Sequence, residues 1–159
     1  MKRVYLEVVA LVERLHRQFL EVVKTEIDRL GVHDVNNVQA MILYHIGNEE
    51  LTVGELTQRG YYLGSNVSYN LKKLIEHEYI AQARSPHDRR SVRIKLTPKG
   101  LELHGKLDGI FQQHSTALEK SEMANGDLTD VGNTLRDLEK FWDSRLGSSA
   151  LTLNSASAA

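Results

Sequence analysis

One segment of alternating polar and apolar residues, Ser91–Leu96, lies in a chain whose longer apolar patterns step by three or four positions. Alternation is the period of a β-strand, whereas steps of three and four are the period of an amphipathic helix. The polar stretch Ser85–Arg90 precedes this segment, and an extended run, Tyr79–Arg84, comes before that. We therefore predict a β-hairpin over 79–96 with a projecting turn, a wing, in a mainly α-helical protein.

The apolar periodicity predicts four helices away from this hairpin. The first covers 4–30, and Asp34 can cap the second. After the hairpin, Thr97-Pro98 can begin a helix, because threonine caps and proline is tolerated at the first helical position. Asp127 can cap the last helix, which ends near Leu146.

A short helix, a tight turn and another helix are predicted directly before the hairpin. Thr52 and Glu55 have the spacing of a capping box, in which each side chain satisfies a backbone N–H near the other. The helix is short because Gly60 and Gly64 bracket a turn, after which Ser65 can cap the next helix. The inward stripe of that next helix is Val67, Leu71, Leu74 and Ile75. Its outward side bears Ser65, Asn66, Ser68, Tyr69, Lys72 and Lys73.

Length and composition limit the class of protein. A chain of 159 residues with 41% hydrophobic residues is long enough for one compact core. We predict a single domain over 1–147, with dimerisation helices over 4–30 and 97–146, a winged helix-turn-helix over 35–96 and a disordered tail over 148–159. No apolar run approaches the roughly 20 residues of a membrane span, so we expect no membrane partner. The chain has no cysteine, which excludes disulfides and a thiol switch, and a cytoplasmic setting is expected.

The basic residues are unevenly distributed along the chain. The whole chain has a formal net charge of −1, yet the segment Gly64–Lys95 carries seven basic and three acidic residues. A basic patch on an otherwise acidic protein is one way to favour a polyanion at a single face. A solvated charged surface gives the same count, so charge alone leaves both interpretations open.

The helix-turn-helix and the hairpin together favour duplex DNA as the partner. The second helix of such a motif enters the major groove, where each base pair presents a distinct pattern of donors and acceptors. Ser65 and Asn66 at its start suit bases or phosphate, and Lys72 and Lys73 suit phosphate. Ser68 and Tyr69 share this exposed side.

The tip of the hairpin carries its own basic residues. Arg89 and Arg90 on a projecting ribbon suit the narrow, electronegative minor groove, and Asp88 can orient one of them. Ordinary solvated residues would explain either element alone. The direct succession of the two elements is more specific than either one.

The segment Asp88–Gly100 resembles the wing of the MarR family, the multiple antibiotic resistance regulators, with Asp-x-Arg, an alternating strand and Leu-Thr-x-x-Gly. Leu51–Leu56 resembles the first helix of that family's helix-turn-helix, Ser65–Leu74 its recognition helix and Val38–Leu43 the helix before it. The segment Arg59–Asn70 is also similar to a subgroup linked to cell-envelope genes that includes an L,D-transpeptidase regulator. The resemblance covers the chain up to about Leu146.

This resemblance implies a MarR-like dimer and a DNA-binding regulator, expected to be a repressor, on a pseudo-palindromic operator. Arg90 would be the minor-groove arginine, Asp88 its brace and Arg89 a phosphate contact. The apolar stripes of the outer helices predict a homodimer. The residues expected at its interface are Leu11, Leu15, Phe111, Leu135, Leu138 and Trp142.

The resemblance also implies a small aromatic or phenolic effector in a crevice between the dimer helices and the winged helix. Phe19, Tyr44, His45 and Tyr61 lie on segments expected to border that crevice, where they would supply an apolar wall with a few polar groups. Plain core or surface aromatic residues are the alternative interpretation of each.

Two other classes of function stay open. An enzyme would need an active site from histidines and carboxylates, yet His104 and His114 are ten positions apart and no His-Glu-x-x-His occurs. We expect no enzyme, no cofactor and no metal, although a metal site built from distant segments is possible. A winged helix that binds only protein is the main alternative, but it has no need of a wing that carries Arg89 and Arg90.

Overall fold

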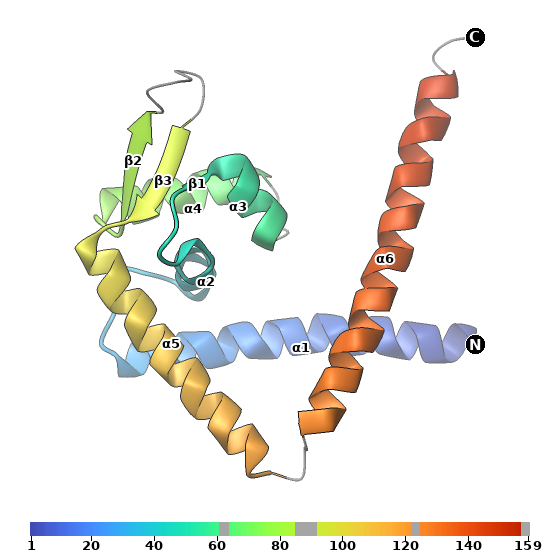
Figure 1. The fold of residues 1–159 in the computed structure, drawn as a ribbon, viewed down its shortest axis with the longest axis horizontal. Coiled ribbons are helices and arrows are strands. Elements are labelled where there is room, and N and C mark those ends of the chain that lie inside the picture. Colours follow the sequence, from blue (N-terminus) through green and yellow to red (C-terminus); the bar gives the residue numbers. More distant parts are fainter. Residues whose placement is uncertain (61–63, 85–91, 122–124, 157–159) are drawn as a thin grey trace. The chain divides into compact units, whose positions relative to one another are not determined.

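The structure is a computed structural model that describes residues 1–60, 64–84, 92–121 and 125–156, with side chains over 1–59, 66–83, 92–121 and 126–146. It is mainly helical with one small antiparallel sheet, as predicted (Figure 1). The contacts divide the chain into two compact units, Met1–Phe111 and Gln112–Ala159. The elements are α1 (Lys2–Arg29), α2 (Asn37–Ile46), β1 (Leu51–Thr52), α3 (Val53–Gly60), α4 (Gly64–Glu76), β2 (Ile80–Arg84), β3 (Val92–Leu96), α5 (Pro98–Glu119) and α6 (Asn125–Ala156).

The sheet has the strand order β1-β3-β2, and both neighbouring pairs are antiparallel. Strands β2 and β3 pair from Ile80↔Leu96 to Arg84↔Val92, which confirms the predicted hairpin strands. The predicted turn Ser85–Arg90 lies outside the described residues, and so does Ser91 at the start of the predicted second strand. Strand β1 was not predicted, because a strand of two residues is too short to show alternation. Its Leu51 pairs with Ile94 and so fixes the start of α3 beside the wing.

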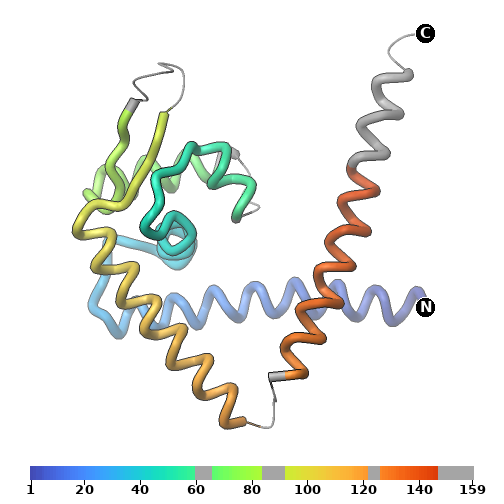
Figure 2. The backbone as a smooth tube through the Cα atoms, in the orientation of Figure 1, coloured from blue at the N-terminus to red at the C-terminus, as the bar shows by residue number. Residues whose placement is uncertain are grey.

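The core of the first unit fills the space between the sheet and the helices. Ile94 and Leu96 lie on the same face of β3 and are buried together with Ile80 of β2, as the pleat of a half-covered sheet requires. They meet buried side chains from α1 to α5, and the backbone trace shows α2 and α3 beside the hairpin (Figure 2). The helical side of this core includes Val23, Ile27, Ile42, Leu43, Leu56, Val67, Leu74, Leu103 and Leu107.

The helix caps confirm part of the sequence prediction and correct part of it. Thr52 accepts the Glu55 N–H, and Glu55 accepts the Thr52 N–H at 2.6 Å, so the predicted capping box is present. Helix α2 is capped by Asn36 and not by Asp34. Asn36 is favoured because it forms a capping box with Gln39, three residues later. The Asn36 side chain accepts the Gln39 N–H, and the Gln39 side chain accepts the Asn36 N–H at 3.0 Å.

The two later caps differ from each other. Thr97 accepts the Gly100 N–H at 3.1 Å at the start of α5, as predicted. Helix α4 begins at Gly64, so Ser65 lies inside the first turn and is not the residue before it. The helix therefore begins two residues earlier than a Ser65 cap implies, and no local signal indicates this start because glycine is a poor helix former.

The second unit holds the end of α5 and helix α6. Helical backbone continues to Ala156, beyond the predicted end near Leu146. The segment after Gly147 has no proline and contains alanine and leucine, which favour helix. In the part of the chain that the structure describes, no helix combines the length and the apolar character that a membrane crossing requires.

Candidate nucleic-acid interface

Helix α4 presents one apolar and one polar side, as the sequence predicts. Val67, Leu71 and Leu74 are buried against the core, which holds the helix along its length. Asn70 is also buried, and its amide Nδ2 donates to the Asn66 carbonyl at 2.8 Å, so this polar group is satisfied within the helix. The predicted contact residues Asn66, Ser68, Tyr69 and Lys72 are all exposed, and the side chain of Ser65 lies outside the described residues.

Tyr69 is the largest exposed group on this side of α4. It is 61% exposed although it is aromatic. An aromatic residue on the polar face of a recognition helix offers apolar contact and a hydroxyl to a base edge. This position fits the predicted contact surface better than it fits a place in the core.

The two lysines of α4 share one carboxylate. Lys73 Nζ lies 2.8 Å from Glu76 Oε2, and Lys72 Nζ lies 3.9 Å from Glu76 Oε1. The hydrogen bond from Lys73 lowers the pKa of Glu76, and the same bond raises the pKa of Lys73. Both groups are therefore charged at neutral pH, and a phosphate has to compete with Glu76 for the lysines.

Two arginines of this region are also paired with acids. Arg59, at the end of α3, holds Glu49 through two bonds of 2.9 and 2.7 Å, which lowers the pKa of Glu49. Arg93, on β3, donates to the Glu50 carboxylate at 3.1 Å and to the Glu50 carbonyl at 2.8 Å. These pairs tie α3 and the wing to the turn between α2 and β1. The sequence prediction assigned neither arginine to this role, because the partners lie far apart in sequence.

A groove of about 350 Å³ lies between the recognition helix and the wing. It brings Ser68 and Lys72 of α4 beside Gln82 of β2. Gln82 was not predicted as a site residue. Its position on a predicted strand directly after the helix-turn-helix is the sequence feature that could have indicated it. The groove is lined by Val53, Ser68, Leu71, Lys72, Ile75, Glu76, Gln82 and Ile94.

The predicted tip of the wing cannot be placed in this geometry. Asp88, Arg89 and Arg90 lie outside the described residues, and so does Tyr61 of the predicted crevice. Their roles stay predictions. The described strands of the wing end at Arg84 and resume at Val92.

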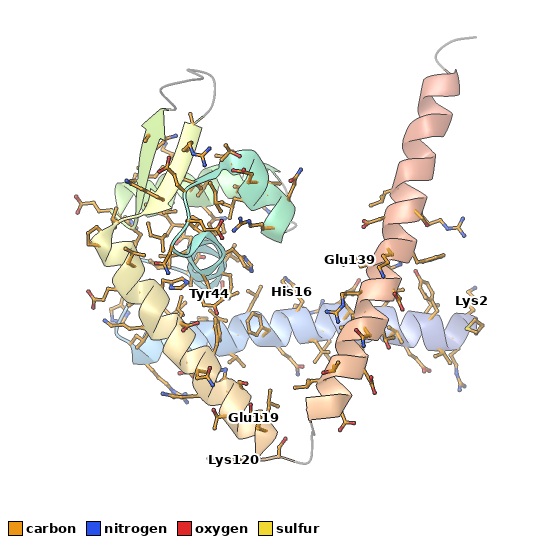
Figure 3. The ribbon with its side chains drawn as sticks, in the orientation of Figure 1. Lys2, His16, Tyr44, Glu119, Lys120 and Glu139 are labelled. Atoms are coloured by element: carbon orange, nitrogen blue, oxygen red, sulfur yellow. The ribbon has the colours of Figure 1, made fainter. Side chains whose placement is uncertain are left out.

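Three of the four predicted crevice residues gather between α1, α2 and α5. Tyr44 is labelled in Figure 3. Its ring stacks on His104 with ring centroids 5.1 Å apart and meets the Phe111 ring edge-on at 4.9 Å. The ring centroids of Phe19 and Phe111 are 5.9 Å apart, and those of His45 and Tyr44 are 6.5 Å apart. The sequence prediction did not include His104 in this cluster.

The polar groups of this aromatic cluster are partly withdrawn from water. Burial, together with the hydrogen bond that its hydroxyl donates to Asp108 at 3.1 Å, raises the pKa of Tyr44. Burial lowers the pKa of His45, which favours its neutral form. The cluster therefore combines an apolar wall with a few polar atoms. Among the described residues, no group of three histidine or acidic side chains is placed to hold a metal ion.

A helix-turn-helix with an exposed polar recognition helix, followed directly by an antiparallel wing, defines a winged-helix DNA-binding protein. A family model described as a winged helix DNA-binding domain matches residues 35–100. The exopolysaccharide II synthesis transcriptional activator ExpG of Rhizobium meliloti (strain 1021) is 40% identical over 138 residues, which cover 87% of this chain and 71% of ExpG.

Solved structures share the fold. FabT of Streptococcus pneumoniae, solved in complex with DNA, has a TM-score of 0.69 at 20% identity, over 88% of this chain and 98% of FabT. MarR of Staphylococcus aureus, solved with salicylate and kanamycin, has a TM-score of 0.70 at 21% identity, over 89% of this chain and 93% of that protein.

The chain belongs to the MarR family of winged-helix transcription regulators. It is a DNA-binding regulator and not an enzyme. The narrower likeness to a cell-envelope subgroup stays a prediction.

Proposed function

We propose that this regulator binds a pseudo-palindromic operator as a homodimer, with one helix α4 in each of two major grooves. The observation that carries the proposal is the exposed polar side of α4, from Asn66 to Lys72, next to a wing of two paired strands. FabT was solved in complex with DNA, which supports the same partner for this chain. Two-fold symmetry requires half-sites about one helical turn apart.

Exposed apolar side chains support the homodimer. In the first unit, Leu11, Leu15 and Phe19 on α1 are each more than two-fifths exposed. In the second unit, Val131 and Leu135 on α6 are exposed to a similar degree. A monomer rarely leaves such stripes in water, and a second copy would cover them. The other predicted interface residues, Phe111, Leu138 and Trp142, are half-buried in the single chain.

Selection of binding sites from random duplexes tests the operator, and sedimentation tests the dimer. We expect an inverted repeat to be enriched and a species of twice 18.0 kDa at low micromolar concentration. A folded 18.0 kDa monomer that binds a single half-site would refute the dimeric operator. Retention of a protein partner with no preference among DNA sequences would favour the alternative of a protein-only module.

The direction of regulation has two candidates. The sequence analysis favours repression, in which the bound dimer blocks polymerase at an overlapping promoter. ExpG, the relative that is 40% identical, is described as an activator, which favours activation as the second candidate. Transcription in vitro from a promoter that carries the selected operator separates the two, because repression lowers the transcript level and activation raises it.

We further propose that a small aromatic or phenolic compound modulates DNA binding through the cluster around Tyr44. The salicylate in the Staphylococcus aureus MarR structure is of this class. The apolar rings of Phe19 and Phe111 with the polar atoms of Tyr44 and His45 suit a ring that bears a carboxylate or hydroxyl. Linkage requires that a ligand which weakens operator binding also binds the operator complex more weakly, by the same factor. Titrations of phenols and aromatic acids with and without operator test this, and equal affinities would contradict it.

A further inference from the structure

The turn that joins the recognition helix to the wing, His77–Tyr79, is held by Thr97, which caps α5, and by Lys99 in the first turn of α5. Lys99 Nζ donates to the His77 carbonyl at 2.9 Å, and Thr97 Oγ1 donates to the Glu78 carbonyl at 2.6 Å. The Thr97 N–H donates to the Tyr79 carbonyl at 3.1 Å. Three consecutive carbonyls of the turn are thus bound, two by Thr97 and one by Lys99. Glu78 has a φ of 62°, a conformation that most side chains disfavour, so the turn depends on these bonds.

A second element holds the side chains of the same turn. The Tyr79 hydroxyl donates to Asp34 Oδ1 at 2.8 Å, and Lys99 Nζ donates to Asp34 Oδ2 at 3.1 Å. His77 donates from Nδ1 to the Asp34 carbonyl at 2.6 Å. The Lys99 ammonium also lies 4.1 Å from the centre of the Tyr79 ring, and Tyr79 is only 4% exposed. Asp34 belongs to the loop between α1 and α2, so the turn is fixed between that loop and α5.

Close backbone contact accompanies these bonds. A Cβ atom at Gly100 would lie 2.2 Å from the Tyr79 carbonyl oxygen and 3.2 Å from Leu96 Cβ. Only glycine fits there, so the start of α5 lies directly against the turn. A shift of α5 therefore has to move the turn or break this contact.

We propose that Asp34, Tyr79 and Lys99, called here the clamp, fix the direction of helix α4 relative to α5 and so position its DNA-contacting end. The clamp acts at the C-terminal end of α4, whereas Asn66 lies at the other end. A helix of this length spans about 20 Å, so a rotation of about 10° at the turn moves the far end by about 3.5 Å. That displacement matches about one base pair of rise along DNA.

The contacts of α4 with the core leave the direction of this helix to be fixed by the clamp. Val67 and Leu74 hold the helix against the core through apolar packing, which has little directional preference. The bonds of the clamp have strict distance and angle requirements, and they join α4 to the helix that leads into the proposed dimer interface. The clamp thereby fixes the spacing between two recognition helices. This inference rests on the proposed homodimer on a two-fold operator.

The test is a Lys99→Met variant on operators whose half-site separation is lengthened or shortened by one base pair. Methionine keeps an apolar chain beside the Tyr79 ring and removes the ammonium. We expect about a fivefold to tenfold loss on the preferred spacing and a smaller penalty for the altered spacings than in the wild type. Tyr79→Phe, which removes only the hydroxyl, should shift the preference in the same direction. The matched control is Lys106→Met on the same helix, where the ammonium contacts Glu102 at 2.7 Å, and its spacing preference should be unchanged.

Equal losses at every spacing in Lys99→Met and Tyr79→Phe, with the wild-type preference kept, would overturn the clamp. Amide exchange in the free protein gives a readout that needs no operator. The Tyr79 and Thr97 amides should exchange faster in Lys99→Met than in Lys106→Met, and equal rates would also overturn the clamp. A wild type with no spacing preference would instead refute the dimeric operator, and amide exchange would then decide the clamp alone.

Discussion

Replacement of Gly100 by alanine should destabilise the protein, although alanine is the better helix former. The added Cβ would lie 2.2 Å from the Tyr79 carbonyl oxygen, a backbone atom that cannot rotate away. Relief of this overlap requires a displacement of about 1 Å. The same oxygen accepts the Thr97 N–H at 3.1 Å, so the displacement would stretch that bond beyond hydrogen-bonding distance.

The magnitude follows from three effects. Overpacking costs about 1 to 3 kcal/mol, and the lost hydrogen bond adds about 1 kcal/mol. The helix preference of alanine over glycine offsets about 0.5 to 1 kcal/mol. The free energy of unfolding should therefore fall by about 1 to 3.5 kcal/mol, which lowers Tm by about 2 to 14 °C for a chain of this size.

Gly105 is the matched control, because it lies in the same helix and a Cβ there would meet nothing within 4 Å. Gly105→Ala should raise the free energy of unfolding by about 0.5 to 1 kcal/mol. Urea and thermal unfolding at one protein concentration measure both variants, since stability of a dimer depends on concentration. A Gly100→Ala protein as stable as Gly105→Ala would refute the close contact between α5 and the turn.

Three further predictions concern DNA binding and pH. Glu76→Gln should tighten binding to operator and to random DNA alike, by about threefold at low salt, because phosphate no longer competes with the carboxylate. A filter-binding titration over a salt series measures this affinity, and an unchanged affinity would contradict the prediction. Arg90→Ala should cost about 1 to 3 kcal/mol of binding free energy on the operator and relax the preference for a narrow minor groove, whereas Lys73→Ala should weaken binding to all DNA sequences alike. Equal losses of affinity for Arg90→Ala on operator and random DNA would exclude recognition of groove shape. Burial opposes ionisation of Asp34, but the hydrogen bonds from Tyr79 and Lys99 outweigh it and lower its pKa below 3.8, so its contribution to stability should be present above that pH and lost as pH falls below it. Unfolding between pH 2 and pH 6 should show a shallower acid loss in Asp34→Asn than in the wild type, and parallel curves would argue against the role of the ionised carboxylate.

The helices and the wing could be predicted from sequence because each depends on local periodicity. The stripe of Val67, Leu71 and Leu74 determines which side of α4 is buried, and the alternation before Thr97 determines the strand β3. Local chemistry also predicted the Thr52 cap. It failed at Asp34, because aspartate is a good capping residue in general and nothing local shows that its carboxylate is bound elsewhere.

The partners of Asp34 show why part of the site could not be predicted. Its two side-chain donors lie 45 and 65 positions away in sequence, on the turn before β2 and on α5. The same limit applies to Tyr44, which meets Phe111 and its other neighbours on α5 only in the folded chain. Composition predicts which residue types gather, but the tertiary fold decides which of them meet. The cluster around Tyr44 gains His104 and Asp108 in this way.

The count of charges along the chain overstates the positive charge that DNA meets. Lys72 and Lys73 share Glu76, and Arg93 is bound to Glu50, so three of the basic residues counted in the segment Gly64–Lys95 already have acidic partners. A phosphate that approaches these groups has to break or share an existing ion pair, which reduces the gain from each contact. Contacts that do not depend on charge, such as those available to Asn66 and Tyr69, are unaffected by this competition. Affinity for operator and for random DNA is therefore lowered alike, while the base contacts that distinguish the operator from the vast excess of competing genomic sites keep their strength. By this reasoning, the acidic residues beside the recognition helix limit how tightly the protein binds DNA of any sequence, and discrimination between sequences depends on the uncharged contacts of this face.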